Sequence, residues 1–539
     1  DHRDLHSFPT RRSSDLNKSV CAAILISLVA CSKEDAGETD SSAIPEGYIE
    51  VKVTPERTKM IRNPFNGWVL YSGLGDGLSE TFWEDYDNFQ SSEGIVNVSD
   101  YASVLYIKGA WSDMNPEENV YIWQDGVNTK PAQRLRMLME GAEERGLKLA
   151  FTFSVDSRDK HYNITPDWVK DKTNGNGGFW STTGSTQVWS PYPDDPTFQE
   201  CWTKFITAFA EKFNDPTRVE FISGLALGKW GESHTVIYST GANNDDPKEA
   251  VVNFLSDLLI NAFTKVPVVV NYHRSFASTK GEGIDPDSET LLDMLVNKGF
   301  SLRHDAFGMK HYYMDWERNY VKKWNYKRPV IMEGGWVKSS HGSSINGDGY
   351  ANYAEVRQGE FDEARGACVN MMDFRYSSDM VNGETASWFN DAFDLVNEFI
   401  AEGGYRIYPD RIILPEEVTL GDEITIRHRW TNLGWGYCPT NIPQWANRFE
   451  VTFALLDSST GQPVALFQDD AAQPHEWIKG SQKTYTLNTK VGNVAPGSYI
   501  WAVGIVDKIY ENTKIGINLA AKENITDDGW LKLHEVTVK

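Results

Sequence analysis

The sequence predicts an α/β protein: a (β/α)8 TIM barrel followed by an antiparallel, immunoglobulin-like β-sandwich. Between residues 48 and 403, short apolar runs alternate with amphipathic helical stretches, which is the pattern of repeated βα units. From residue 404 to residue 539 the helical periodicity ends, and polar and apolar residues alternate between turns rich in Gly, Pro, Asn and Asp. This second pattern is typical of an antiparallel sandwich.

Eight apolar runs are the predicted strands of the barrel. They are GWVLYS, ASVLYIKG, LKLAFTFSV, VEFISGLALG, VPVVVNY, AFGMKHYY, PVIME and ACVNMMDF, which begin at residues 67, 102, 147, 219, 266, 306, 329 and 367. The stretches between them carry apolar residues at helical spacing, as after Leu135 and after Phe198, and we expect these faces to pack on the strands. Eight such units match a (β/α)8 barrel with loop insertions. A doubly wound sheet is the alternative.

The N-terminal segment has the features of a targeting sequence. The apolar stretch from Ser19 to Ala30 is too short to span a bilayer as a helix, and residues 17–31 therefore read as a signal peptide. Its end, LVAC, resembles the lipobox of bacterial lipoproteins, which implies that Cys31 is lipidated and holds the protein on the outer membrane, facing outward. An ordinary cleaved signal is the alternative. We expect residues 32–47 to be a flexible tether.

The first residues carry no functional weight. Residues 1–16 contain SFPTRRSSDL, which resembles the translation of a sequencing adapter, and they show no hydrophobic periodicity. We therefore expect residues 1–16 to be an artefact outside the folded protein.

Charge and cysteine usage exclude several classes of function. The chain has 52 Lys and Arg against 76 Asp and Glu, a net charge of -24, which repels nucleic acids, and no nucleic-acid partner is expected. Cys201, Cys368 and Cys438 have no paired spacing that would indicate a disulfide framework or a zinc site. The sequence therefore predicts no cofactor. The many aromatic residues suit sugar faces as well as cores.

Two predicted strands end in a carboxylate, at the position where barrel enzymes carry their chemistry. The fourth run leads to Glu232, directly after Trp230 and Gly231, and the seventh leads to Glu333 in RPVIMEGGW. Hydrolysis of a glycosidic bond needs two carboxyl groups, one that donates a proton and one that attacks or activates water. Glu232 and Glu333 are therefore the predicted catalytic pair, and an ion pair in the folded structure is the alternative reading of each.

With these motifs in this order, the sequence resembles a clan A glycoside hydrolase over roughly residues 63 to 400. The stretch WSDMNPEENVYIW, which begins at Trp111, resembles the clan's signature after strand two. The resemblance implies that the acid/base lies at the end of strand four and the nucleophile at the end of strand seven. It also implies a tyrosine near the end of strand six that hydrogen-bonds the nucleophile, and KHYYMDW offers Tyr312 or Tyr313.

The sequence departs from the clan pattern at two strand ends. Clan members usually carry Asn before the acid/base, where it grips a sugar hydroxyl, and here that position is Gly231. Strand eight often ends in Trp, and here it ends in MMDFRY. We expect His234 or Arg375 to bind the sugar hydroxyl instead, and Asp373 is a fallback catalytic acid.

Further side chains near the predicted strand ends are candidates for substrate binding. Asp156 lies beside Arg158 after strand three and reads as a positioning group rather than the reacting acid. The histidines near strands four to six read as hydroxyl-binding or packing groups, because strand one lacks the His-x-His of metal-dependent barrel hydrolases. The full set of candidates is Trp111, Asp156, Arg158, Trp230, His234, His273, His311, Tyr312, Tyr313, Trp336, Asp373 and Arg375.

The sequence thus predicts a surface-anchored glycoside hydrolase that cleaves a poly- or oligosaccharide with retention. A carbohydrate is the expected partner, the membrane is contacted through the lipid anchor alone, and other glycan-uptake proteins are candidate partners. The first alternative is a glycan-binding lipoprotein on a barrel that has lost turnover, which Gly231 favours. A metal-dependent barrel hydrolase is the second. The C-terminal segment with TNLGWG resembles a sandwich of unassigned function that follows such barrels in bacterial lipoproteins.

Overall fold

Eight parallel strands close into a barrel, which confirms the predicted fold class. The computed structural model describes residues 43–75, 77–158, 160–181, 187–233, 235–242, 244–272, 276, 286–310, 312–335, 348–375, 383–510 and 513–539. The barrel strands are β2 (Gly67–Gly73), β5 (Ala102–Ala110), β6 (Lys148–Ser154), β9 (Val219–Ser223), β10 (Val268–Asn271), β11 (Ser301–Phe307), β12 (Val330–Gly334) and β13 (Met371–Asp373). Each pairs in parallel with the next, and β13 closes on β2 with Met371 opposite Gly67.

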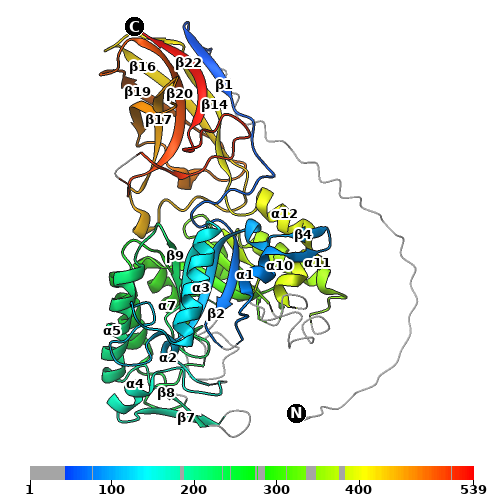
Figure 1. Ribbon diagram of the computed structural model, residues 1–539, viewed down its shortest axis with the longest axis vertical. Helices are drawn as coiled ribbons and strands as arrows, with labels where there is room; N and C mark the ends of the chain where they lie inside the picture. The colour runs from blue at the N-terminus through cyan, green and yellow to red at the C-terminus, as the bar shows by residue number, and fades with distance from the viewer. Residues whose placement is uncertain are drawn as a thin grey trace, which may run out of the picture. The chain divides into compact units, whose positions relative to one another are not determined.

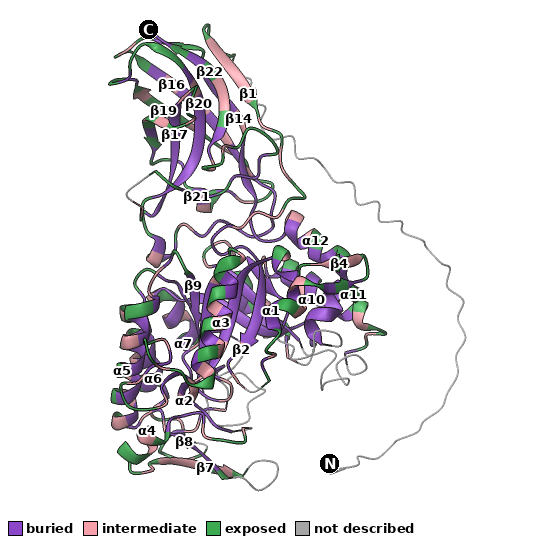
Figure 2. Ribbon diagram, in the orientation of Figure 1, coloured by how far each residue is buried: buried purple, intermediate pink, exposed green. Residues whose placement is uncertain are grey.

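Helices surround the barrel, as Figure 1 shows. The longer ones are α3 (Lys130–Glu144), α5 (Pro196–Phe213), α6 (Lys248–Ala262), α7 (Pro286–Lys298), α8 (Asp315–Trp324), α10 (Tyr353–Gly366), α11 (Glu384–Asp391) and α12 (Phe393–Glu402). Figure 2 shows the strands buried and the outer faces of α3 and α5 exposed. Because helices cover the barrel outside and side chains fill it inside, its strands are apolar on both faces. This is why they are visible in the sequence as continuous apolar runs.

The helix starts follow ordinary capping chemistry. Thr129 accepts a hydrogen bond from the backbone N–H of Ala132 at the start of α3, with Pro131 in the first turn. Asp195 caps α5 in the same way through the N–H of Phe198. Shorter elements fill the connections: α1 (Phe82–Asp87), α2 (Trp111–Met114), α4 (Asp167–Lys172), and the hairpins β3 (Phe89–Ser91) with β4 (Gly94–Val96) and β7 (Gly177–Ser181) with β8 (Gln187–Pro191).

The sixth strand lies earlier in the chain than predicted. The prediction began it at residue 306, whereas β11 covers Ser301–Phe307. The difference arises because β11 carries charged residues that are nevertheless buried, among them Arg303 and Asp305. Asp305 accepts a hydrogen bond from Asn271 of β10 (3.2 Å), and Arg303 forms an ion pair with Glu333 of β12. A hydropathy pattern does not identify such a strand, because its charged side chains are buried against polar or charged partners on neighbouring strands.

Two further sheets share a core and form the C-terminal sandwich. One has the order β1-β14-β16-β19 and the other β15-β22-β20-β17-β18, with β21 on β20. Trp430 and Ile412 of the first sheet and Val451 and Trp501 of the second belong to one buried cluster. The strands are β1 (Tyr48–Lys52), β14 (Ile407–Pro415), β15 (Glu417–Val418), β16 (Glu423–Asn432), β17 (Phe449–Asp457), β18 (Pro463–Asp469), β19 (Lys483–Lys490), β20 (Gly497–Asp507), β21 (Ile515–Ile517) and β22 (Leu531–Val538).

The segment assigned to the barrel also contains one strand of the sandwich. Residues 48–52 form β1, which pairs antiparallel with β14, so that Tyr48 lies opposite Pro415. Because β1 and β14 are far apart in the chain, no local sequence pattern indicates that they pair. The apolar pattern of β1 alone does not show that it belongs to the sandwich rather than to the barrel. The sandwich therefore takes strands from both ends of the described chain.

The sandwich contacts the N-terminal end of the barrel. Asn370, which precedes β13, donates a hydrogen bond to the carbonyl of Tyr437 (2.7 Å), and the ring of Phe65 packs edge-on against Trp445 at 5.5 Å. These contacts leave the sandwich away from the carboxyl ends of the barrel strands, where barrel enzymes build their sites. Among the residues that the model describes, no helix is both long and apolar enough to cross a bilayer.

Candidate active site

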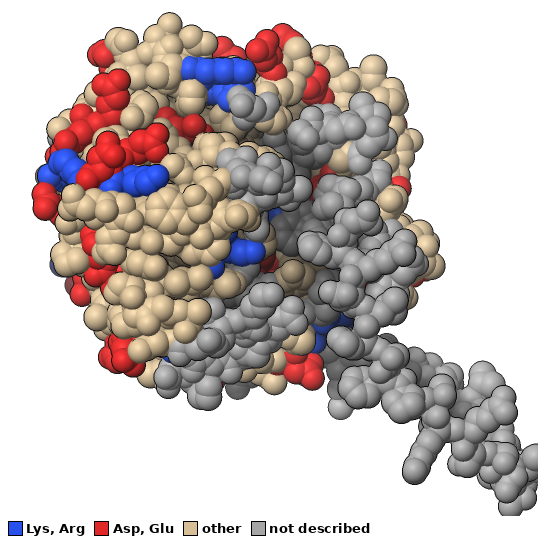
Figure 3. Space-filling model, turned by 90° about the horizontal axis from the view of Figure 1, so that it is seen from below, with Lys and Arg blue, Asp and Glu red and all other residues tan. Residues whose placement is uncertain are grey.

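A pocket of about 350 Å³ lies at the carboxyl ends of the barrel strands. Its walls come from β2, β5, β6 and the segments after β6, β9 and β13; charged and aromatic lining residues include Tyr71, Lys108, Lys160, Tyr162, Trp230, Glu232 and Arg375. Figure 3 views the molecule from the end at which Figure 1 labels β7 and β8. In this view Asp and Glu gather mainly toward the upper left, with Lys and Arg among them, and a few Lys and Arg atoms lie nearer the centre.

The segment that carries Glu232 is irregular rather than a continued strand. Regular β9 ends at Ser223, earlier than predicted, and Glu232 pairs through a single isolated bridge with Leu227 of the same irregular segment. Between them the backbone is left-handed at several positions, including Ala226 (φ 57°) and Trp230 (φ 57°). Non-glycine residues adopt this conformation at a cost and concentrate at functional sites. Glu232 is 7% exposed on the pocket wall, and its Oε1 lies 3.6 Å from Nζ of Lys108.

Gly231 has a structural reason to be glycine. Its φ is +79°, and a Cβ at this position would lie 2.4 Å from the backbone oxygen of Phe153. The neighbouring chain is tied down as well, since Ser154 Oγ donates a hydrogen bond to the carbonyl of Trp230 (3.1 Å). An asparagine therefore does not fit before Glu232 on this backbone. A sugar hydroxyl at this point would have to be bound by another side chain.

Glu333 occupies the end of β12 between two arginines. It is 1% exposed and absent from the described pocket lining, and its two carboxylate oxygens form ion pairs with Arg303 of β11 and with Arg375 after β13, which lines the pocket. Two guanidinium groups at ion-pair distance stabilise the ionised form of a carboxyl group. Each guanidinium also lies over a tyrosine ring: Arg303 over Tyr106 at 4.8 Å and Arg375 over Tyr71 at 5.6 Å.

The backbone after Glu333 is held by two buried carboxyl groups. Gly334 donates its N–H to Oδ1 of Asp373 (3.1 Å), and Gly335 donates its N–H to Oε1 of Glu360 on α10 (2.7 Å). Burial raises the pKa of Asp373 to about 7 against the opposing effect of Arg303, and it raises the pKa of Glu360 to about 7 as well. Asp373 thus acts on the backbone beside Glu333 and is absent from the described pocket lining.

A buried ion network supports Glu360 from behind. Arg357 donates to Glu360 Oε2 (2.6 Å) and to Glu384 Oε2 of α11 (2.8 Å), and all three side chains are almost fully buried. Removing one member of such a network leaves a charge buried without its partner. The network therefore connects two helices to the backbone that follows Glu333.

Trp111 belongs to the core rather than to the substrate surface. Its ring is fully buried and packs edge-on against Trp202 at 4.9 Å, and its Nε1 donates to Oδ1 of Asn115 (3.3 Å). The motif that begins at Trp111 thus builds the packing between β5 and α5. The prediction that Trp111 binds substrate is therefore wrong, because its indole ring has no exposed face.

Tyr313 does not occupy the position expected of the tyrosine beside the nucleophile. Its ring stacks on Phe307 at 4.3 Å, and its hydroxyl lies 3.3 Å from that of Tyr272. Strand β11 ends at Phe307, several residues earlier than the prediction placed it, and the guanidinium of Arg303 contacts Glu333 instead. Tyr312 is partly exposed and is absent from the described pocket lining.

Asp156 and Arg158 form a buried ion pair. Arg158 Nε donates to both oxygens of Asp156 (2.9 and 2.8 Å), Ser190 Oγ donates to Asp156 Oδ1 (3.2 Å), and Arg158 also donates to the carbonyl of Thr235. This pair joins the loop after β6 to the segment just beyond Glu232. Neither side chain belongs to the described pocket lining, and a substrate-positioning role of Asp156 stays a prediction.

Five predicted residues lie outside the described part of the chain: Cys31, His234, His273, His311 and Trp336. Sequence reasoning also missed several residues of the site, among them Lys108, Lys160, Arg303 and Glu360. The signal for Lys108 is a basic residue inside an otherwise apolar strand, whereas Arg303 lies beside His304 and Asp305 and has no such signal. Among the described residues no group of three or more His, Cys, Asp or Glu side chains is arranged to hold a metal ion.

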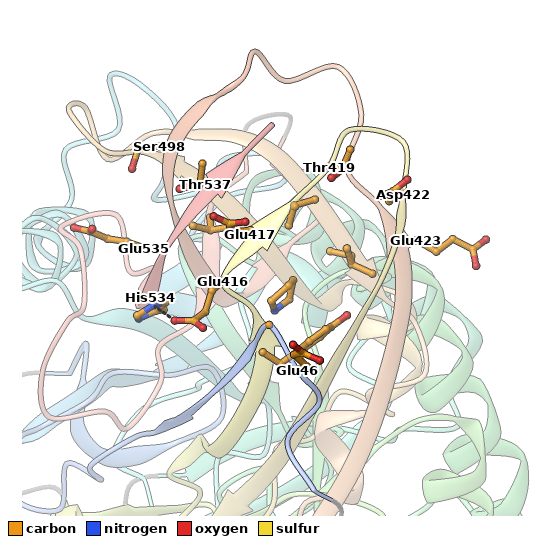
Figure 4. Close-up of a pocket in the computed structure, with 16 residues that line it drawn as sticks. Glu46, Glu416, Glu417, Thr419, Asp422, Glu423, Ser498, His534, Glu535 and Thr537 are labelled. Atoms are coloured by element: carbon orange, nitrogen blue, oxygen red, sulfur yellow. Dashed lines mark ion pairs between the residues drawn. The ribbon is translucent and has the colours of Figure 1, made fainter.

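A larger pocket of about 650 Å³ lies in the sandwich. Acidic residues line it, and Glu416 forms an ion pair with His534 at 3.8 Å. Figure 4 shows that the carboxylates of Glu423 and Glu535 project to opposite sides rather than toward a common point. We assign no site to it.

Comparisons with known proteins concern the barrel architecture. No protein-family model and no curated protein matches the sequence. The chain is similar to the catalytic domain of β-amylase from Paenibacillus polymyxa, with a TM-score of 0.40 and 9% identity over 63% of this chain and 99% of that one. It is also similar to a GH30 endoxylanase from Clostridium papyrosolvens (TM-score 0.35, 11% identity, 81% and 99% covered). A third is endo-glycoceramidase II from a Rhodococcus species (TM-score 0.36, 10% identity, 80% and 100% covered). At these values the likeness carries no argument about activity.

Proposed function

We propose that the barrel hydrolyses O-glycosidic bonds of a poly- or oligosaccharide, with Glu333 as nucleophile and Glu232 as acid/base. The supporting observation is that two buried glutamates follow the fourth and seventh strands of one barrel in opposite settings. Glu333 is paired with two guanidinium groups, whereas Glu232 lies on the pocket wall beside Lys108. A glycosidase needs one carboxyl group that stays ionised and one that exchanges a proton.

The proposed reaction proceeds in two displacements. The carboxylate of Glu333 attacks the anomeric carbon, the bond from that carbon to the leaving oxygen breaks, and Glu232 gives its proton to the leaving oxygen. Glu232 then removes a proton from water, whose oxygen attacks the same carbon and releases Glu333 as a carboxylate. Two inversions give overall retention. For attack, one oxygen of Glu333 must exchange its guanidinium partner for the sugar carbon.

The experiment that tests this function combines trapping with substitution. A panel of 2-deoxy-2-fluoro glycosides with good leaving groups should label the peptide that contains Glu333, since the fluorine slows hydrolysis of the covalent intermediate. Glu333→Gln should abolish labelling, and Glu232→Gln should lower turnover by roughly 10²–10⁴-fold, the usual contribution of a general acid. Glu200→Gln, on an exposed face of α5, is the matched control. Turnover that survives Glu333→Gln would contradict the assignment.

A second candidate is a glycan-binding protein without turnover. The observation that favours it is that both oxygens of Glu333 are already paired with guanidinium groups. This candidate predicts that the wild type and Glu333→Gln bind the same glycans and that neither cleaves any of them. Measurable hydrolysis by the wild type that Glu333→Gln removes would eliminate it.

We further propose that Cys31 carries a lipid anchor that holds the barrel outside the outer membrane. The support is the apolar segment that ends in LVAC. Cells grown with a labelled fatty acid should incorporate label into the wild type and not into Cys31→Ala. Protease added to intact cells should digest the barrel; a protected barrel would contradict the outward orientation.

A further inference from the structure

The pocket beside Glu232 is lined by several basic side chains, although the chain as a whole is acidic. In the whole sequence 76 acidic residues outnumber 52 basic ones. Among the described residues that line this pocket are the cations Lys108, Lys160 and Arg375 and the carboxyl groups of Asp113 and Glu232, and Arg375 is also paired with Glu333. If Glu232 is protonated, as an acid/base must be when it donates, a single lining carboxylate remains. Cations in a concave site attract anionic ligands.

Lys108 is the lining cation that forms an ion pair with Glu232. It stands near the end of β5, its Nζ lies 3.6 Å from Oε1 of Glu232, and its side chain is 23% exposed. Burial lowers the pKa of Lys108, Glu232 and Asp305 act in the opposite direction, and Arg303 adds to the lowering. An ammonium group at this distance stabilises the ionised form of Glu232. The proposed mechanism, however, needs Glu232 protonated when the substrate is bound.

We infer that the substrate is an anionic saccharide, whose carboxylate or sulfate group pairs with Lys108 and so releases Glu232 to take up a proton from the solvent. The ammonium group exchanges one anion for another and is never left buried without a partner, which would be unfavourable. Glu232 then donates this proton to the leaving oxygen. The inference rests on the proposed function and adds a substrate class to it.

The recognition is completed by groups on the same walls. Lys160 lies on another segment of the wall, Arg375 is paired with Glu333, and Trp230 offers an aromatic ring of the kind on which sugar faces pack. A neutral sugar would leave the pair between Lys108 and Glu232 in place. It would therefore bind in the state that is unfavourable for proton donation.

The first test compares substrates that differ in one charge. The probes are 4-nitrophenyl glucuronide and galacturonide, their methyl esters, and the corresponding glucoside and galactoside with and without a 6-sulfate. We expect kcat/KM for the carboxylate or the sulfate probe to exceed that for its neutral partner by at least about tenfold, the change that 1.4 kcal/mol produces. The ester comparison needs no variant, so it stands even if substitutions destabilise the protein. Equal values would overturn the inference and leave the hydrolase intact.

The second test removes the cation. Lys108→Met should abolish the preference for the charged probe, with the neutral probe affected less, whereas Lys204→Met on α5 should change neither. A Lys108→Met variant that loses activity on the charged and the neutral probe in equal proportion would show that Lys108 does not bind the anionic group of the substrate. A melting curve reports whether each variant is folded.

A third measurement separates this inference from the proposed function. Calorimetry with oligogalacturonides and their methyl esters reports binding whether or not any glycoside is cleaved. At least tenfold tighter binding of the acid form, lost in Lys108→Met, would support an anionic ligand even if the wild type hydrolyses nothing. Equal affinity for acid and ester would overturn it even if hydrolysis is found.

Discussion

Substitution of Gly231 is the most direct test of how the chain presents Glu232. In Gly231→Ala the new Cβ would lie 2.4 Å from the backbone oxygen of Phe153, closer than such atoms approach, and φ is +79°. The left-handed conformation costs roughly 1–2 kcal/mol for a residue with a side chain. Relief of the contact requires a backbone shift, for which overpacking of a core gives a scale of roughly 1–3 kcal/mol. The expected loss in free energy of unfolding is therefore about 2–5 kcal/mol.

Gly421 provides the matched control. Its φ is +86°, and a Cβ there would have no atom within 4 Å, so Gly421→Ala should lose only the cost of the backbone conformation, about 1–2 kcal/mol. Urea unfolding followed by tryptophan fluorescence measures both variants. If Gly231→Ala loses no more stability than Gly421→Ala, the contact with Phe153 does not constrain this position. The same experiment with Gly231→Asn tests whether the residue usual in clan A enzymes is incompatible with this backbone.

Three further outcomes are expected. Glu360→Ala removes the acceptor of the Gly335 N–H and the partner of Arg357, and should lose about 3–5 kcal/mol of stability, whereas Glu360→Gln keeps an acceptor and should lose less; equal losses in urea unfolding would contradict this. Burial raises the pKa of Asp373 from 3.8 to about 7, so folding favours its protonated form, and the stability that it contributes should fall as pH rises from about 4 to about 7. The slope is at most about 1.4 kcal/mol per pH unit, and Asp373→Asn should flatten it in urea unfolding at several pH values; an unchanged slope would refute the assignment. Because Trp111 is buried, Trp111→Phe should lower the urea midpoint and leave KM unchanged for any glycoside that is cleaved. A raised KM would indicate that Trp111 contacts the substrate after all.

The barrel was predictable because burial on both faces makes its strands continuous apolar runs. A hydropathy pattern does not identify a strand whose charges are paired with those of a neighbouring strand, as in β11. Arg303 suggests a loop in the sequence, and only its ion pair with Glu333 explains its burial in a strand. The pattern fails also for β1, because its partner β14 lies more than 350 residues away. In both cases the missing information is the identity of a neighbour in space.

The candidate site was predictable at its two glutamates for a similar reason. A carboxylate directly after a buried strand must lie at the mouth of a parallel barrel, so Glu232 and Glu333 could be named from position alone. Their partners could not, because a strand end does not say which neighbouring side chain reaches it. The prediction for Trp111 was wrong for a different reason. A motif indicates where a residue lies in the fold but not whether its ring is exposed, and the ring of Trp111 is buried.

The two glutamates are held by different means, and the difference corresponds to the different tasks proposed for them. Glu333 ends a regular strand, pairs with two arginines, and is followed by backbone N–H groups that buried carboxyl groups hold. That arrangement keeps both its charge and its position, as a nucleophile requires. Glu232 follows an irregular segment and forms an ion pair with Lys108, which lines the pocket. One accessible partner can be exchanged for a substrate group at each turnover, as a residue that gains and loses a proton needs, whereas two guanidinium groups favour a carboxyl group that stays ionised.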